Sequence, residues 1–172
     1  MFAPPLNMKK IILISDTHSY IPQNFWKYLD GYDELWHAGD VGNVGLIDKL
    51  KSVIAVRGVY GNIDGTEVRK EFPEHLVFTE QGVKTVMLHI GGKPYVYSPR
   101  MRGLIRQHRP KVVVCGHSHI LRVEYDKRDK VLYLNPGALG NQGFHKVKTI
   151  LRFTLENGEI KNMEAVELGG RK

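Results

Sequence analysis

Histidine, aspartate and asparagine side chains recur in this sequence directly after short apolar runs. Four segments share this placement: Asp16-Thr17-His18, Gly39-Asp40, Gly61-Asn62-Ile63-Asp64 and Gly116-His117-Ser118-His119. A fifth apolar run ends at His89. Carboxylate, imidazole and amide oxygen together suit Mn, Fe, Co, Ni or Zn, whereas calcium is held by oxygen ligands alone. The residue types therefore indicate a transition-metal site.

The apolar runs predict the strands that would position these side chains. Strands are predicted at residues 11–14, 34–37, 53–56 and 112–115, and helices at residues 22–29, 45–50 and 99–108. The alternation of strand, loop and helix in the first third favours parallel strands. Ligands bind at the carboxyl ends of the strands in open α/β sheets, so we expect the polar segments to surround one crevice.

The remaining sequence predicts antiparallel strands. Residues 76–80 and 84–89 form a predicted hairpin, and the later strands are predicted at residues 121–125, 131–134, 148–155 and 160–166. The pair Asn157-Gly158 is typical of a two-residue hairpin turn. We therefore expect two sheets packed against each other with helices outside.

Composition and length favour one ordinary domain. The 172 residues correspond to about one domain, which we place at residues 8–172 after an N-terminal extension of residues 1–7. The single cysteine, Cys115, cannot form an internal disulfide, and no apolar run is long enough to span a membrane. A cytoplasmic protein without a membrane partner is expected. The formal charge of +7 is spread along the chain, so a solvated surface is favoured over a nucleic-acid interface.

Taken together, the polar segments resemble the calcineurin-like metallophosphoesterases. The resemblance extends over residues 9–137 and includes Asn135-Pro136-Gly137, which is similar to a loop of the small bacterial and archaeal phosphodiesterase branch. It implies an α/β fold, a four-layer α-β-β-α sandwich of two mixed sheets with helices on the outer faces. It also implies a homo-oligomer, either a dimer or a tetramer.

The resemblance also implies a set of metal ligands. Two divalent transition-metal ions are expected, with Mn favoured and Ni, Fe, Co or Zn as alternatives. The first ion would be held by Asp16, His18 and His119. The second would be held by Asn62, His89 and His117. Asp40 would bridge the two ions, since a carboxylate has two oxygens and an imidazole nitrogen cannot span two metals.

The activity expected from this resemblance is metal-dependent hydrolysis of a small phosphate ester, with phosphodiesters favoured. A hydroxide between the two metals would be the nucleophile, so Asp40 and Asn62 would act catalytically by holding the metals. Asp64 would orient the Asn62 loop without touching a metal. Two alternatives stay open: a phosphomonoesterase of the same fold, and a metal-binding interaction scaffold without hydrolysis, as in the retromer subunit Vps29.

Several positions depart from the family pattern or lie outside it. Many relatives have histidine where this chain has Ile63, which removes one candidate proton donor for the leaving group. His89 is the weakest match, because the glycine that usually follows it is displaced by one residue. Arg57 and His145 are candidate substrate-binding residues. The basic helix at residues 99–108 is expected to be solvated; if it faced the cleft, it would favour a polyanionic substrate.

Overall fold

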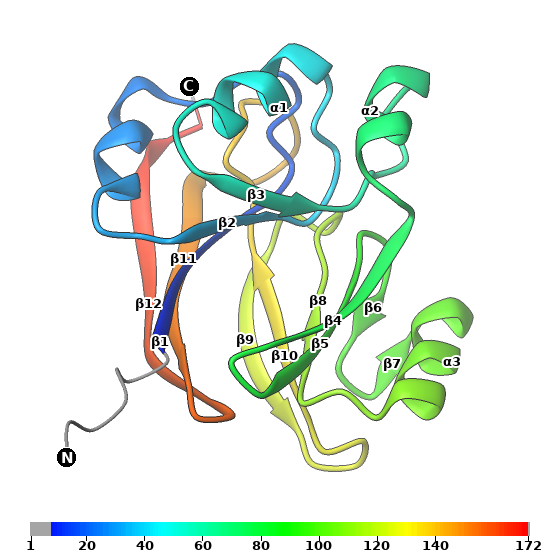
Figure 1. Cartoon of the computed structure of the whole chain (residues 1–172). Coiled ribbons are helices and arrows are strands. Elements are labelled where there is room, and N and C mark those ends of the chain that lie inside the picture. Colours follow the sequence, from blue (N-terminus) through cyan, green and yellow to red (C-terminus); the bar gives the residue numbers. More distant parts are fainter. Residues whose placement is uncertain (1–7, 172) are drawn as a thin grey trace, which may run out of the picture.

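The computed structural model describes residues 8–171 and contains two mixed five-stranded sheets (Figure 1). The strand order is β12-β11-β1-β2-β3 in the first sheet and β4-β5-β8-β10-β9 in the second. The first sheet consists of β1 (Met8–Ile14), β2 (Glu34–His37), β3 (Ala55–Gly58), β11 (Val147–Glu156) and β12 (Glu159–Gly170). The second consists of β4 (His75–Glu80), β5 (Val83–Leu88), β8 (Val112–Val114), β9 (Leu121–Asp126) and β10 (Val131–Pro136).

The first sheet is parallel on one side and antiparallel on the other, whereas the second has a parallel centre and antiparallel margins. β1, β2 and β3 run parallel, while β11 is antiparallel to β1 and β12 to β11. In the second sheet β5, β8 and β10 run parallel, while β4 and β9 are antiparallel to their neighbours. The parallel strands in each sheet therefore end at one edge, which is where the polar segments follow them.

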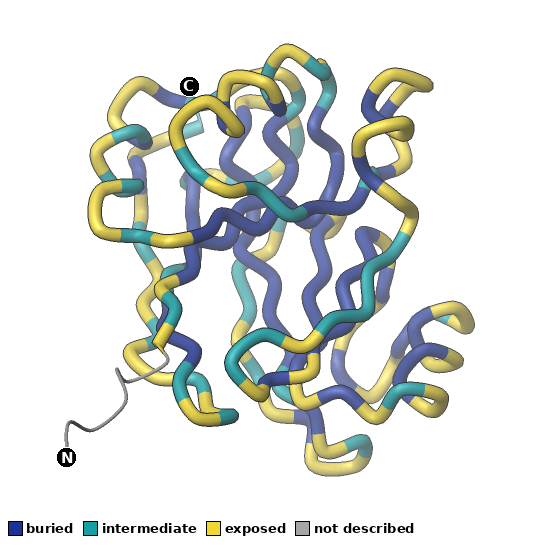
Figure 2. Tube along the Cα trace, viewed as in Figure 1, coloured by how far each residue is buried: buried dark blue, intermediate teal, exposed yellow. Residues whose placement is uncertain are grey.

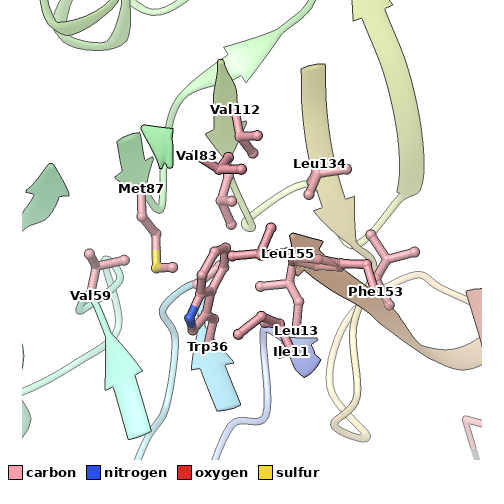
Figure 3. Close-up of a cluster of buried hydrophobic side chains, with 13 residues drawn as sticks. Ile11, Leu13, Trp36, Val59, Val83, Met87, Val112, Leu134, Phe153 and Leu155 are labelled. Atoms are coloured by element: carbon pink, nitrogen blue, oxygen red, sulfur yellow. The ribbon is translucent and has the colours of Figure 1, made fainter. Parts of the chain in front are cut away.

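The main core lies between the two sheets (Figure 3). Side chains alternate along β1, so Ile11 and Leu13 enter a cluster with Trp36 and with residues of the second sheet such as Val112 and Leu134. The intervening residues Ile12 and Ile14 belong to a separate cluster on the other face. The apolar run in β1 is continuous because both faces of the strand are covered.

Helices cover both outer faces. The 3₁₀ helix Gln23–Leu29 and α1 (Val44–Lys51) contribute Phe25 and Leu50 to the cluster outside the first sheet. Helix α3 (Pro99–His108) packs Met101, Leu104 and Ile105 on the second sheet. This arrangement is the predicted four-layer α-β-β-α sandwich, and the tube view shows its buried interior (Figure 2).

Three details differ from the expected elements. Residues 53–56 are not a buried strand: the amides of Val53 and Ile54 bond back to Leu50 in the turn after α1, and β3 begins at Ala55 as a partly exposed edge strand. Residues 23–29 form a 3₁₀ helix rather than an α-helix. The third difference is a set of short elements that the sequence did not predict: α2 (Thr66–Glu71), β6 (Gly92–Lys93) and β7 (Val96–Tyr97).

The predicted N-terminal extension, residues 1–7, lies outside the described residues. Among residues 8–171, no helix has the length and apolar character needed to cross a bilayer. Cys115 is a free, fully buried thiol in the core under α3.

Candidate metal centre

The loops after β1, β2, β5 and β8 bring histidine and aspartate side chains into two adjacent groups. Asp16, His18 and His119 form one group, and Asp40, His89 and His117 form the other. Within each group the candidate donor atoms all lie within 4.8 Å of one another. The structure thus assembles six of the seven expected ligands into clusters of the size that one metal ion needs.

Asp16 lies at the centre of the first group and is fully buried. Its Oδ2 accepts a hydrogen bond from the His117 amide at 3.1 Å, which ties the β1 loop to the β8 loop. Its Oδ1 lies 3.1 Å from His119 Nε2. Neither Asp16 Oδ1 nor His18 Nε2 makes a hydrogen bond within the described residues, although both atoms are buried.

His89 lies in the second group and is 2% exposed. Its Nδ1 donates a hydrogen bond to the Ala38 carbonyl at 2.7 Å, so the neutral ring presents Nε2 as an acceptor. That Nε2 lies 3.2 Å from Asp40 Oδ1. Burial alone would lower the pKa of His89, but the carboxylates of Asp40 and Asp16 outweigh it and raise the pKa. The glycine after His89 stands one residue later than in many relatives, but His89 still lies beside the other candidate ligands.

Gly39 permits this close approach of His89 to the β2 loop. A Cβ atom at Gly39 would lie 2.6 Å from His89 Nδ1, and the backbone φ of +98° already disfavours other residues. The glycine of the Gly39-Asp40 pair therefore makes room for the neighbouring imidazole.

Asp40 lies between the two groups. Its Oδ1 lies 3.2 Å from His89 Nε2, and its Oδ2 lies 3.8 Å from His18 Nε2. Burial favours the protonated acid, but the neighbouring His89 and the Ile63 amide outweigh it, so the pKa of Asp40 is lowered. An ionised carboxylate with one oxygen toward each group is the geometry expected of a bridging ligand.

The donor atoms fit a pair of cations. Three buried acceptors, Asp16 Oδ1, His18 Nε2 and His89 Nε2, have no hydrogen-bond partner within the described residues. A buried polar atom without a partner costs roughly 1–3 kcal/mol, and such atoms are few in folded proteins. Bound metal ions would satisfy all three, with mixed nitrogen and oxygen ligands of the type that transition metals accept.

Asp64 cross-links the Asp40 and Asn62 loops. Its Oδ2 accepts hydrogen bonds from the amides of Val41 at 3.1 Å and Gly61 at 2.8 Å, and its Oδ1 accepts one from Gly42 at 2.7 Å. Asp64 is 2% exposed and belongs to neither metal-ligand group. Its contacts suit the expected orienting role.

His37 and Thr17 form a second buried link between the β1 and β2 loops. His37 Nδ1 accepts a hydrogen bond from the Gly39 amide at 3.1 Å, so the hydrogen is on Nε2, which faces Thr17 Oγ1 at 2.9 Å. Thr17 in turn donates to the Val41 carbonyl at 3.0 Å. Burial lowers the pKa of His37 to about 4, which keeps the ring neutral and this chain of hydrogen bonds intact.

Most of the candidate ligands have a positive backbone φ angle, which could not be predicted from the sequence. Positive φ angles occur at five of them: Asp16, His18, Asp40, His117 and His119. Such angles are uncommon for residues with a Cβ atom, so their concentration at the candidate ligands marks backbone that the surrounding contacts hold in place. At His117 and His119 the two rings join different groups, so this segment is not extended and reaches both candidate metal positions.

The other sequence candidates lie in different surroundings. His145 packs its ring 5.3 Å from that of His119 and makes a 3.0 Å hydrogen bond with the Gly140 carbonyl, so it adjoins the first group. Arg57 instead lies in an ion-pair cluster, with Nε 2.8 Å from Glu34 Oε1 and Nη2 3.2 Å from Glu80 Oε2. Its guanidinium is engaged there and does not line the cavity at the metal-ligand groups.

That cavity, of about 310 Å³, opens beside the second group and has Asn62 and His89 in its wall. Its other walls include Tyr60, Arg69 and Arg100, none of which the sequence singled out as a site residue. Arg69 belongs to the unpredicted helix α2. Arg100 is the second residue of the basic helix α3, which was expected to be solvated.

Comparison with known proteins agrees with this geometry. Residues 8–158 match the model of the calcineurin-like phosphoesterase superfamily domain. The chain belongs to this superfamily. Its members are metal-dependent hydrolases of phosphate esters, and the two ligand groups are where such a protein would hold its metal.

Individual relatives share 30% or less of their residues with this chain. A probable metallophosphoesterase of Methanocaldococcus jannaschii is 30% identical over 133 residues, which cover 73% of this chain and 66% of that protein, just under two thirds of its length. The Vps29 structure from Cryptosporidium parvum has a TM-score of 0.72 and 22% identity, covering 94% of this chain and 98% of that one. An archaeal phosphodiesterase has a TM-score of 0.70 and 21% identity, covering 92% and 99%. At these identities the two structures share the fold.

Proposed function

We propose that this protein is a phosphodiesterase that uses two divalent metal ions. The observation that carries the proposal is the position of Asp40, whose two carboxylate oxygens face His89 in one ligand group and His18 in the other. A mononuclear site would not need a carboxylate in that place. The proposed ligands are Asp16, His18 and His119 for one ion and Asn62, His89 and His117 for the other, with Asp40 shared.

When bound, two such ions would supply a water of lowered pKa and offset negative charge on the phosphate oxygens. The chain's own contribution is to fix geometry. Asp64 holds the Asp40 loop against the Asn62 loop, and the His37–Thr17 pair holds the β1 loop against the β2 loop. These buried hydrogen bonds keep the candidate donor atoms in place, so little reorganisation is needed when substrate binds.

The preference for diesters rests on the resemblance to the small phosphodiesterase branch. Ile63 bears on the leaving group instead, because its side chain cannot donate a proton. Ile63 is 46% exposed beside Asn62 and donates only its backbone amide, to Asp40. A substrate with a stable leaving group needs no protonation, so activated diesters are expected to react fastest. Mn is the favoured metal, with Ni, Fe, Co or Zn as alternatives. The cytoplasmic location and the homo-oligomer stay proposals from the sequence.

The test is a metal-by-substrate panel on the purified protein. Each candidate metal is combined with bis(p-nitrophenyl) phosphate, p-nitrophenyl phosphate, cyclic nucleotides and short single-stranded oligonucleotides. We expect hydrolysis of the model diester with Mn, and its loss together with weaker metal binding in Asp40→Asn. The matched control is Asp48→Asn, which removes one exposed carboxylate from α1 and should change neither.

Each alternative predicts a different pattern. A monoesterase would hydrolyse p-nitrophenyl phosphate faster than the diester. An interaction scaffold would bind metal and turn over neither ester. A metal stoichiometry of one per chain, unchanged in Asp40→Asn, would contradict the shared-ligand geometry.

A further inference from the structure

The cavity beside the second ligand group is lined by two chemically distinct kinds of side chain. Tyr60, Leu88 and Ile90 supply apolar surface. Arg69, Glu74 and Arg100 supply charge. Asn62 and His89 also line the cavity, and His89 belongs to the second metal-ligand group. A ligand that fills this space would touch apolar surface, two guanidinium groups and the proposed metal site together.

Arg69 is held in place from the metal-site side. Its Nε donates a 2.7 Å hydrogen bond to the Asp64 carbonyl, and its guanidinium carbon lies 4.4 Å from the centre of the Tyr60 ring. Nε is engaged with the loop that carries Asn62, so the guanidinium is positioned by that loop. The two Nη atoms are available to an anion in the geometry that arginine offers to phosphate and carboxylate.

Arg100 is contributed by a second helix and lies in the first turn of α3. Its Nη2 lies 3.3 Å from Glu74 Oε2 and 3.3 Å from His75 Nδ1. Glu74 is the sole carboxylate among the residues that line the cavity, against two arginines, so the lining keeps an excess of positive charge. The Arg100–Glu74 pair is about half exposed, which makes it weak and easily exchanged for a substrate anion.

We propose that this cavity binds the part of the substrate beyond the scissile phosphate, and that it selects esters whose organic moiety carries a second anionic group. This inference rests on the proposed phosphodiesterase function and adds a substrate class to it. The scissile phosphate would lie at the metal-ligand groups, an apolar moiety against Tyr60 and Ile90, and the second phosphate or carboxylate between Arg69 and Arg100. A nucleotide that bears a further phosphate has this combination of groups.

The test compares substrates that differ in one phosphate. Thymidylyl-thymidine is assayed without a terminal phosphate, with a 5′-phosphate and with a 3′-phosphate, so that the scissile linkage is constant. We expect kcat/KM to be about tenfold higher or more for at least one of the phosphorylated substrates. In the double variant Arg69→Gln/Arg100→Gln the ratio of kcat/KM for the phosphorylated to the unphosphorylated substrate should fall to about one, whatever happens to the absolute rates.

A matched control separates local recognition from general attraction. The double variant Lys70→Gln/Arg106→Gln removes the same charge from the same two helices at exposed positions outside the cavity. It should keep the advantage of the phosphorylated substrate. If both double variants lose it equally, or if wild-type protein shows no advantage, the inference is overturned.

A binding measurement makes the result independent of hydrolysis. Calorimetry on the metal-free full chain compares thymidine 3′,5′-bisphosphate with thymidine 5′-monophosphate. Tighter binding of the bisphosphate, lost in Arg69→Gln/Arg100→Gln alone, supports the cavity assignment even if no ester is hydrolysed and the proposed activity fails. Equal binding of both ligands contradicts the cavity assignment even if bis(p-nitrophenyl) phosphate is hydrolysed rapidly.

Discussion

Replacing Asp64 by asparagine tests whether the hydrogen bonds behind the candidate metal centre control metal binding. In Asp64→Asn the amide oxygen can keep the two bonds now accepted by Oδ2, from Val41 and Gly61. The amide NH₂ then faces the Gly42 amide, which loses its acceptor. The variant therefore loses one of the three bonds outright, weakens the other two because the amide acceptor is uncharged, and keeps the size of the side chain.

The expected loss of stability follows from that count. One buried bond to a charged acceptor contributes about 1.5–3 kcal/mol. For a chain of this length 1 kcal/mol corresponds to about 2–4 °C, so the melting temperature should fall by about 3–12 °C. Loosening the Asp40 loop against the Asn62 loop should also weaken Mn binding by about 10- to 100-fold, the usual effect of losing a residue that orients metal ligands. Calorimetry and thermal unfolding measure the two effects separately.

The chain offers a matched control at Asp126. This carboxylate is also fully buried and also accepts three backbone amides, two on Oδ1 and one on Oδ2. Asp126 is the last residue of β9 and belongs to neither metal-ligand group. Asp126→Asn should therefore lower the melting temperature by a similar amount and leave Mn affinity unchanged. If the two variants weaken Mn binding equally, Asp64 acts only through general stability and the orienting role is refuted.

Two further predictions concern other parts of the molecule. Ile63→His should accelerate hydrolysis of esters with poor leaving groups by up to about 10²-fold and leave activated esters nearly unchanged; an unaltered dependence on leaving-group pKa would contradict the missing-acid interpretation. Burial raises the pKa of Glu80, but Lys9 and Arg57 outweigh it and lower the pKa, so the stabilisation is present above the ordinary value of 4.5 and is lost as the pH falls below it. Glu80→Gln should flatten the decline in melting temperature below about pH 4.5, and Arg57→Gln should reduce stability by about 1 kcal/mol without changing KM.

The sequence predicted the layers of the fold well because its long apolar runs encode burial directly. Ile11 to Ile14 have no polar residue between them, and in the structure the run is covered on both faces. Helix α3 was predicted at its observed bounds, because Pro99 begins it and Pro110, two residues after its end, restricts the backbone of Arg109. Short elements lack such signals: α2 has six residues and buries only Val68, so no periodicity can reveal it.

The candidate ligands were predictable for a different reason. Each follows an apolar run, and parallel strands bring such positions to one edge of the sheet. The backbone angles that divide the ligands into two groups were not predictable. His117 and His119 are two residues apart and would share one face of an extended strand, yet positive φ angles at both send them to different groups. Those angles depend on contacts made far away in sequence, such as the bond from the His117 amide to Asp16.

The proposed metal ligands could therefore be predicted from the sequence, whereas the proposed substrate-binding residues could not. The candidate ligands are histidine, aspartate and asparagine residues that directly follow strands, so the sequence pattern predicts them. Arg69 lies instead on a helix without an apolar stripe, and it reaches the cavity because its Nε bonds to the Asp64 carbonyl. Asp64 also accepts the amides that position Asp40 and Asn62, so one residue links the reacting site to the substrate cavity. Asp64→Asn should for this reason weaken metal binding while its carbonyl still holds Arg69, which leaves discrimination between the phosphorylated and unphosphorylated dinucleotides largely intact.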